Sequence, residues 1–153
     1  MNDLDQDSVD ALFFDVLEKM ACMFGEPGDL DEIDEPDEAL FEASMSFEGA
    51  GTGEIRLFVP GSLCTELAAN VLGIDEEDDE AIEIGQDTLR ELLNTLLGQL
   101  LTAMAGVEPV FDLTIPEVVE TDKVPWNDAL TKEKVYLYDV EDHPVLLDVS
   151  KIT

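Results

Sequence analysis

Three polar residues and a glycine in the stretch DTLRELLNTLLGQLL, at positions 87–101, are spaced as on one face of a helix and could together serve chemistry. They are Asp87, Glu91, Asn94 and Gly98, separated by steps of four, three and four residues. Because a helix advances by about 100° per residue, these steps place them on consecutive turns of one face. An acid and an amide beside a glycine would let the backbone of another molecule approach that face.

Two residues of this face lower the stability of the helix. A glycine inside a helix costs about 1 kcal/mol relative to alanine, and asparagine is a poorer helix former than Glu, Lys or Gln. Two explanations fit the residues. Either Gly98 admits another helix of the same fold while Asn94 bonds to a neighbouring loop, or the face is open to a partner molecule.

Three amphipathic helices are predicted from apolar residues that recur at steps of three and four. The first spans 9–24, with Ser8 as its N-cap and Gly25 at its end. The second runs from Ser62 to Gly73, and the longest covers 81–106. In the longest helix the core-facing stripe comprises Leu89, Leu92, Leu93, Leu96, Leu97, Leu100 and Met104.

Alternating apolar residues predict strands at 41–48, 54–60, 111–116, 135–140 and 145–152. The first two form an antiparallel hairpin across a glycine-rich link, and the last two pair across the turn EDHP. We therefore expect an α+β fold, with helices covering a mainly antiparallel sheet in a single domain over 1–153.

The charge of the chain restricts its partners. Lys plus Arg total 7 and Asp plus Glu total 38, so the net charge is −31, although 45% of the residues are hydrophobic. This balance supports a packed core and argues against nucleic acid or an anionic membrane surface as a partner. The negative charge leaves several explanations open. These are a basic target, a metal ion, surroundings of high ionic strength, or simply a well-solvated surface.

Cys22 and Cys64 lie inside apolar helical patterns without metal-ligand spacing, so both are predicted to be reduced core residues. The N-terminus lacks a basic leader, and no apolar run is long enough to cross a bilayer. We expect a cytoplasmic protein with no membrane insertion.

Other signals for chemistry are weak. In DLDEIDEPDE, Ile33 occupies a calcium-ligand position, so no metal site is predicted. His143 lies in the turn EDHP without a second histidine or a cysteine nearby, which argues against zinc or histidine-based catalysis. Trp126 either packs across the domain or lies in an interface.

The stretch DTLRELLNTLLG, with Asp87, Glu91, Asn94 and the later Pro116, resembles the CheX/CheC/FliY family of chemotaxis phosphatases, and the CheX branch most closely. The likeness extends upstream through GTGEIRLFVPGSLCTELAANVLG and downstream through FDLTIPEVV, so that it covers 41–119. The N-terminal helix and C-terminal hairpin match only in type. A CheC/CheX-like domain is the fold that this resemblance implies.

The resemblance also implies an activity, namely hydrolysis of the aspartyl phosphate on a CheY-type receiver domain. In that reading Asn94 positions the attacking water and Glu91 pairs with a lysine of the receiver. Asp87 and Gly98 contribute to docking. The receiver would supply Mg²⁺, so no intrinsic cofactor or metal is expected, and a homodimer is expected by resemblance alone.

Family members with two active helices carry the motif twice, whereas only one copy is found here. Glu18 is followed at the third position by Ala21, and Glu66 by Ala69, so neither supplies an amide. One active face is therefore predicted. The main alternative is a non-enzymatic receiver-binding module or chemotaxis adaptor, and a more distant one is an acidic adaptor for a basic partner.

Overall fold

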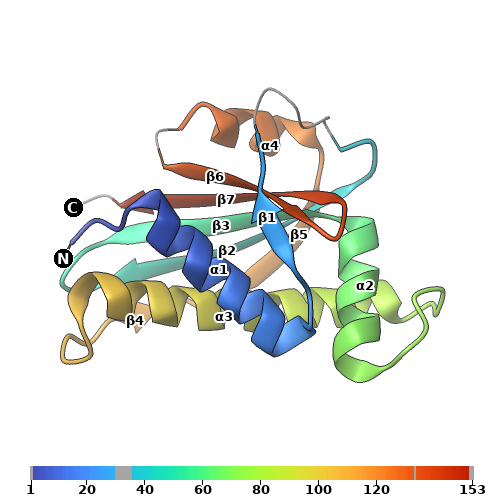
Figure 1. The fold of residues 1–153 in the computed structure, drawn as a ribbon, viewed down its shortest axis with the longest axis horizontal. Coiled ribbons are helices and arrows are strands. Elements are labelled where there is room, and N and C mark those ends of the chain that lie inside the picture. The colour runs from blue at the N-terminus through green and yellow to red at the C-terminus, as the bar shows by residue number, and fades with distance from the viewer. Residues whose placement is uncertain (1, 30–35, 133, 152–153) are drawn as a thin grey trace.

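The chain forms one antiparallel sheet with helices on both faces, in a computed structural model that describes residues 2–29, 36–132 and 134–151 (Figure 1). The helices and strands, in chain order, are α1 (Gln6–Ala21), β1 (Gly25–Pro27), β2 (Leu40–Glu48), β3 (Gly53–Pro60), α2 (Gly61–Leu72), α3 (Ala81–Ala105), β4 (Asp112–Leu113), β5 (Glu117–Thr121), α4 (Lys123–Leu130), β6 (Val135–Val140) and β7 (His143–Lys151). The predicted α+β class is confirmed.

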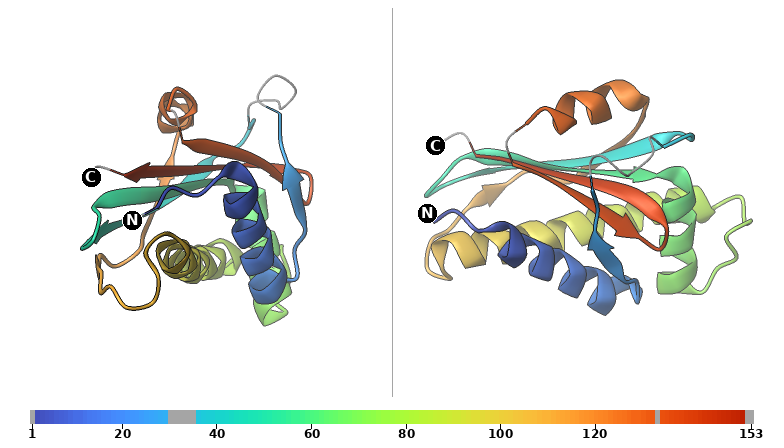
Figure 2. Two further views of the ribbon diagram at one scale, coloured as in Figure 1. Left: turned by 60° about the vertical axis from the view of Figure 1, so that its left-hand side comes forward. Right: turned by 45° about the horizontal axis from the view of Figure 1, so that its top comes forward.

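The sheet contains seven strands in the described part of the chain, in the order β1-β6-β7-β3-β2-β4, with β5 also pairing with β2. Every pairing is antiparallel. Figure 2 shows α1, α2 and α3 on one side of the sheet and α4 on the other. The sheet is therefore the platform that holds α3 in place.

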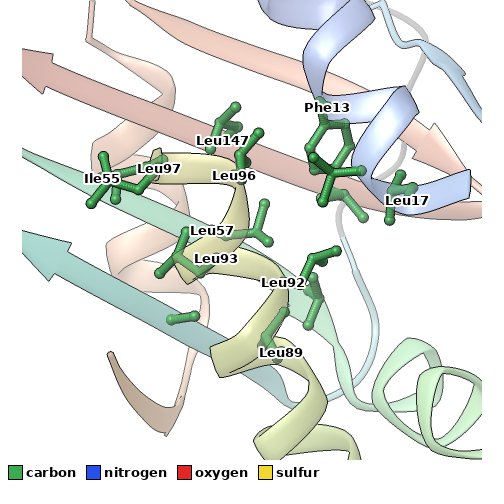
Figure 3. Packing of buried hydrophobic residues seen from close by; sticks show 14 of the residues in the cluster. Phe13, Leu17, Ile55, Leu57, Leu89, Leu92, Leu93, Leu96, Leu97 and Leu147 are labelled. Atoms are coloured by element: carbon green, nitrogen blue, oxygen red, sulfur yellow. The ribbon is translucent and has the colours of Figure 1, made fainter. Parts of the chain in front are cut away.

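The predicted antiparallel hairpin of β2 and β3 is confirmed. Ala43 lies opposite Leu57 and Met45 lies opposite Ile55, and all four side chains are buried. Ile55 and Leu57 face the leucines of α3, which the structure buries as predicted (Figure 3), and Ala43 and Met45 belong to the same buried cluster. Burial of each leucine contributes about 1.5–3 kcal/mol, so the stripe fixes which side of α3 points outward.

The predicted limits of the first helix are wrong at both ends. Asp5, not Ser8, is the N-cap, and its side chain accepts a hydrogen bond from the Ser8 backbone N–H. The helix ends at Ala21 because Cys22 adopts a left-handed conformation, with φ of 52°. Cys22 is consequently exposed, which corrects its prediction as a core residue, whereas Cys64 is buried as expected.

Two elements after α3 differ from the predicted strand at 111–116. That strand is limited to β4, and pairing with β2 resumes in β5, beyond Pro116. The short helix α4 was not predicted. Trp126 of α4 is 2% exposed and meets Phe58 edge to face, so Trp126 packs within the fold on the outer face of the sheet.

His143 is not a turn residue, contrary to the prediction. The turn consists of Glu141 and Asp142, both with positive φ, and His143 is the first residue of β7. Its ring nitrogens lie 3.2 Å from the Ser62 hydroxyl and 2.9 Å from a Glu66 carboxylate oxygen. These contacts connect the start of β7 to α2.

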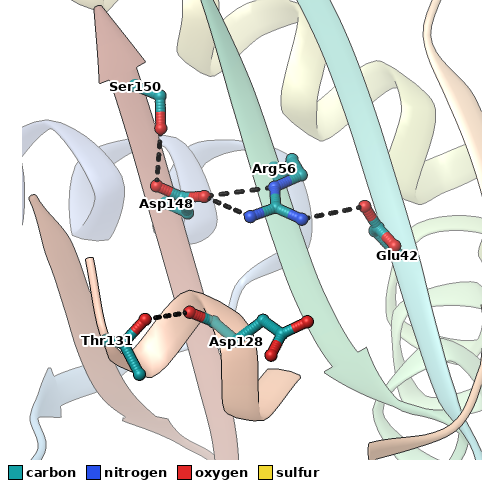
Figure 4. Close-up of polar contacts among 6 residues, drawn as sticks. All are labelled: Glu42, Arg56, Asp128, Thr131, Asp148 and Ser150. Carbon is teal, nitrogen blue, oxygen red and sulfur yellow. Dashed lines mark hydrogen bonds and ion pairs between the residues drawn. The ribbon is translucent and has the colours of Figure 1, made fainter. Parts of the chain in front are cut away.

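The outer face of the sheet carries a buried ion-pair network. Arg56 donates hydrogen bonds from Nε and Nη2 to Asp148, and its Nη1 lies 3.6 Å from Glu42 (Figure 4). Asp148 is 1% exposed. The arginine therefore neutralises a carboxylate that has lost its water.

Three further predictions concern absences. Most of the loop considered for calcium, residues 30–35, lies outside the described residues. Among the described residues, no three His, Cys, Asp or Glu side chains are grouped so that they could hold a metal ion. No helix in the described ranges is long and apolar enough to cross a membrane.

Candidate functional site

Helix α3 presents Asp87, Glu91, Asn94 and Gly98 to solvent, while its leucines are buried against the sheet. The predicted geometry of this face is confirmed. The four residues occupy successive turns of one continuous helix, so their relative positions are set by the helix itself. We call these four residues the α3 face.

The side chains of Glu91 and Asn94 are available to another molecule. In the described part of the chain, neither makes a side-chain hydrogen bond or ion pair. Asp87 differs, because it forms an ion pair with Arg90 one turn later on the same helix. An unpartnered carboxylate and an unpartnered amide one turn apart can together hold a cation and a water molecule.

The structure argues against the first explanation of Gly98. A Cβ atom added at Gly98 would meet nothing within 4 Å, so no second helix among the described residues packs on it. The close helix contact lies instead at Gly85, where a Cβ would overlap the carbonyl group of Cys64 in α2. Sequence reasoning missed this structural role of Gly85, which only the crossing of α2 and α3 reveals.

Two depressions flank the α3 face. One lies beside Gly98 and is lined by Leu12, Asn94, Thr95, Gly98, Gln99, Thr102 and Ala103. The other lies beside Glu91, where α1, α2 and α3 meet, and is lined by Met20, Val71, Leu72, Ile84, Asp87, Thr88 and Glu91. Val71, Leu72 and Ile84 were not predicted as site residues, because nothing in the sequence shows which ends of α2 and α3 lie side by side.

The described residues contain no second copy of the motif. Glu18 is exposed and Ala21 is buried, while Glu66 is in contact with His143. Asn70, one turn after Glu66, donates a hydrogen bond from its amide to the carbonyl oxygen of Ala21. That amide is engaged inside the fold, unlike the amide of Asn94.

Solved structures with the same fold include several chemotaxis proteins. CheX from Vibrio vulnificus has a TM-score of 0.68 and 17% identity over 95% of each chain. The CheX-CheY-BeF3-Mg²⁺ complex from Borrelia burgdorferi matches with a TM-score of 0.66 and 16% identity, over 95% of this chain and 96% of that chain. A CheC-like superfamily protein from Shewanella sp. PV-4 gives a TM-score of 0.61 and 19% identity, over 98% and 100% of the two chains.

At these identities the structural matches show a common fold, and comparison with curated proteins gave no match. A family model provides the more specific result. The model described as chemotaxis phosphatase CheX matches residues 41–138, which is more than half of the chain and includes the whole of α3. The chain therefore belongs to the CheX family of chemotaxis phosphatases.

Proposed function

We propose that this protein hydrolyses the aspartyl phosphate of a CheY-type receiver domain. The observation that carries the proposal is the pair of unpartnered side chains, Glu91 and Asn94, on the exposed side of α3 in a chain of the CheX family. The Borrelia CheX structure is a complex with CheY, which supports a receiver as the partner.

Asn94 is proposed to position the attacking water. An amide donates and accepts hydrogen bonds, so it can orient a water in line with the phosphoryl group without adding negative charge beside it. The water oxygen bonds to phosphorus while the bond from phosphorus to the aspartyl oxygen breaks. Inorganic phosphate leaves and the receiver recovers its free carboxylate.

Glu91 is proposed to pair with a lysine next to the phosphorylation site of the receiver. It lies one helical turn before Asn94, so this pairing would hold α3 at a fixed depth and orient the amide. Mg²⁺ bound by the receiver would neutralise charge on the phosphoryl group. Asp87 and Gly98 are proposed to contribute to docking, and the CheX-like phosphatase is proposed to act as a homodimer.

The test measures the decay of a phosphorylated CheY-type receiver with and without the protein. We expect Asn94→Ala to lose about 100-fold or more of the acceleration, because a misplaced water forfeits much of the benefit of orientation. Asn127→Ala is the matched control, since Asn127 is an exposed asparagine in α4 on the other side of the sheet. Its acceleration should equal that of the unaltered protein.

A different result would favour the non-enzymatic alternative. If the unaltered protein forms a stable complex with the receiver and leaves the phosphate lifetime unchanged, it is a receiver-binding module or chemotaxis adaptor. If Asn94→Ala is folded and fully active, the proposed role of the amide is wrong.

A further inference from the structure

The depression beside Glu91 has an unusual surface for so acidic a protein. Its apolar lining includes Val71 and Leu72 from the last turn of α2, which are 40% and 61% exposed, together with Ile84 from α3. The carboxylates of Asp87 and Glu91 line the same depression. We call this depression the α2–α3 groove.

The fold does not require these exposed apolar side chains. Helix α2 already buries Leu63, Cys64, Leu67 and Ala68, and it ends at Leu72 because Gly73 adopts a left-handed conformation. A polar residue at position 72 would satisfy the helix equally well. Apolar exposure that adds nothing to the core, next to a functional face, is typical of a surface that meets another protein.

The size of the α3 face leads to the same conclusion. The eleven residue-to-residue steps from Asp87 to Gly98 cover about 16 Å of helix, and a helix with its side chains is about 10 Å wide. A specific complex covers about 800 Å² on each partner, so a receiver bound to this face must also cover neighbouring surface. Glu91 belongs both to the face and to the groove, so a receiver that reaches Glu91 lies over the groove.

We propose that the α2–α3 groove is the docking surface for the receiver. This inference rests on the proposed function. The groove combines an apolar floor with two carboxylates, so it fits a receiver surface that presents an apolar side chain next to a basic one. A second copy of this chain is a poorer occupant of this groove, because pairing groove against groove would place the Asp87 and Glu91 carboxylates of the two copies together.

The groove also explains how the complex could form although both partners are negatively charged where they meet. A phosphorylated receiver site is itself negatively charged, and this chain repels it at long range. Apolar contact acts only at short range and does not depend on the sign of the charges. Leu72 and Val71 would therefore supply attraction that the acidic surface lacks.

The experiment compares receiver binding by Leu72→Gln and Val124→Gln, with a CheY-type receiver loaded with beryllium fluoride and Mg²⁺. Leu72 and Val124 are both 61% exposed, but Val124 lies in α4 on the opposite side of the sheet. We expect Leu72→Gln to raise Kd about fivefold or more, and to raise KM for the phosphorylated receiver by a similar factor while kcat is unchanged. Val124→Gln should leave both constants unchanged.

Several outcomes separate this inference from the proposed function. If Leu72→Gln and Val71→Gln both bind as tightly as the unaltered, active protein, the inference fails and the phosphatase proposal stands. If the unaltered protein neither binds the receiver nor speeds its dephosphorylation, both fail. If Leu72→Gln changes the oligomeric state and leaves receiver affinity intact, a second copy covers the groove and the inference is overturned.

Discussion

Asn94 and Gly98 are residues that helix propensity disfavours at exposed positions inside a helix. In the described part of the chain the Asn94 side chain makes no hydrogen bond, and a Cβ atom at Gly98 would contact nothing within 4 Å. In contrast, Gly85 has an evident structural reason, since the chain of α2 passes directly over it. The difference between the two glycines shows that α3 uses one for packing and leaves the other exposed beside the amide.

Gly98→Ala is expected to stabilise the protein and impair its activity. A methyl group has open space there, so alanine should raise the free energy of unfolding by about 0.5–1 kcal/mol. The same methyl group would stand between α3 and the receiver, and should raise KM about fivefold, as expected for about 1 kcal/mol of overpacking. Denaturant unfolding and receiver dephosphorylation measure the two effects.

The two effects of Gly98→Ala are independent of each other. An active variant with increased stability would show that the receiver does not approach Gly98. A variant with decreased stability would contradict the open space that the structure shows at this position.

At the residue level, the spacing of Glu91, Asn94 and Gly98 was sufficient to predict their common exposed face, because one helix determines all three positions. The partners of His143 were beyond prediction. Ser62 and Glu66 are about 80 residues away in the chain, and only the packing of β7 beside α2 brings them to His143. Cys22 was misassigned because one left-handed residue ended its helix early.

At the level of elements, the long periodic segments were predicted and the short ones were not. Helix α3 spans 25 residues and repeats its apolar stripe many times. Strand β1 spans 3 residues and helix α4 spans 8, too few for a period to be recognised. Both depend on what lies beside them, since β1 pairs with β6 and α4 places Trp126 against Phe58.

Arg56 is expected to be important for holding β3 and β7 together on the outer face of the sheet. Burial lowers the pKa of Arg56, but the hydrogen bond and charge of Asp148, together with the charges of Glu42 and Glu54, outweigh this effect and raise the pKa overall, so the guanidinium stays charged. Arg56→Met leaves Asp148 buried without its cation. The free energy of unfolding should fall by about 3–5 kcal/mol.

A double variant isolates the cause of that loss. Adding Asp148→Leu to Arg56→Met removes the isolated carboxylate and should recover most of the lost stability. Lys19→Met is the matched control, because its ion pair with Asp15 is largely exposed and should be worth about 0.5 kcal/mol or less. If Arg56→Met and Lys19→Met lower the free energy of unfolding equally, the Arg56–Asp148 pair contributes no more to stability than an exposed ion pair does.

At the scale of the whole molecule, the charge of −31 opposes the partner that the CheX family implies. The described acidic residues include the run at 75–80, which connects α2 to α3. In the proposed complex, receiver binding would combine long-range repulsion with short-range attraction from apolar contact in the groove and from the proposed pairing of Glu91 with a lysine. The long-range repulsion and the short-range attraction respond differently to salt.

Added salt is expected to speed association with the receiver. Between about 0.01 M and 0.15 M ionic strength the Debye length falls from about 30 Å to about 8 Å, which screens the repulsion between the approaching proteins. The association rate constant should rise about tenfold or more over this range. The dissociation rate constant should change little, because apolar contact in the groove is not screened and an ion pair buried in the complex is screened much less than exposed charges. Stopped-flow binding measurements with the beryllium fluoride-loaded receiver determine both constants. A fall in the association rate constant with added salt would instead identify a basic binding surface on the partner, as the acidic-adaptor alternative requires.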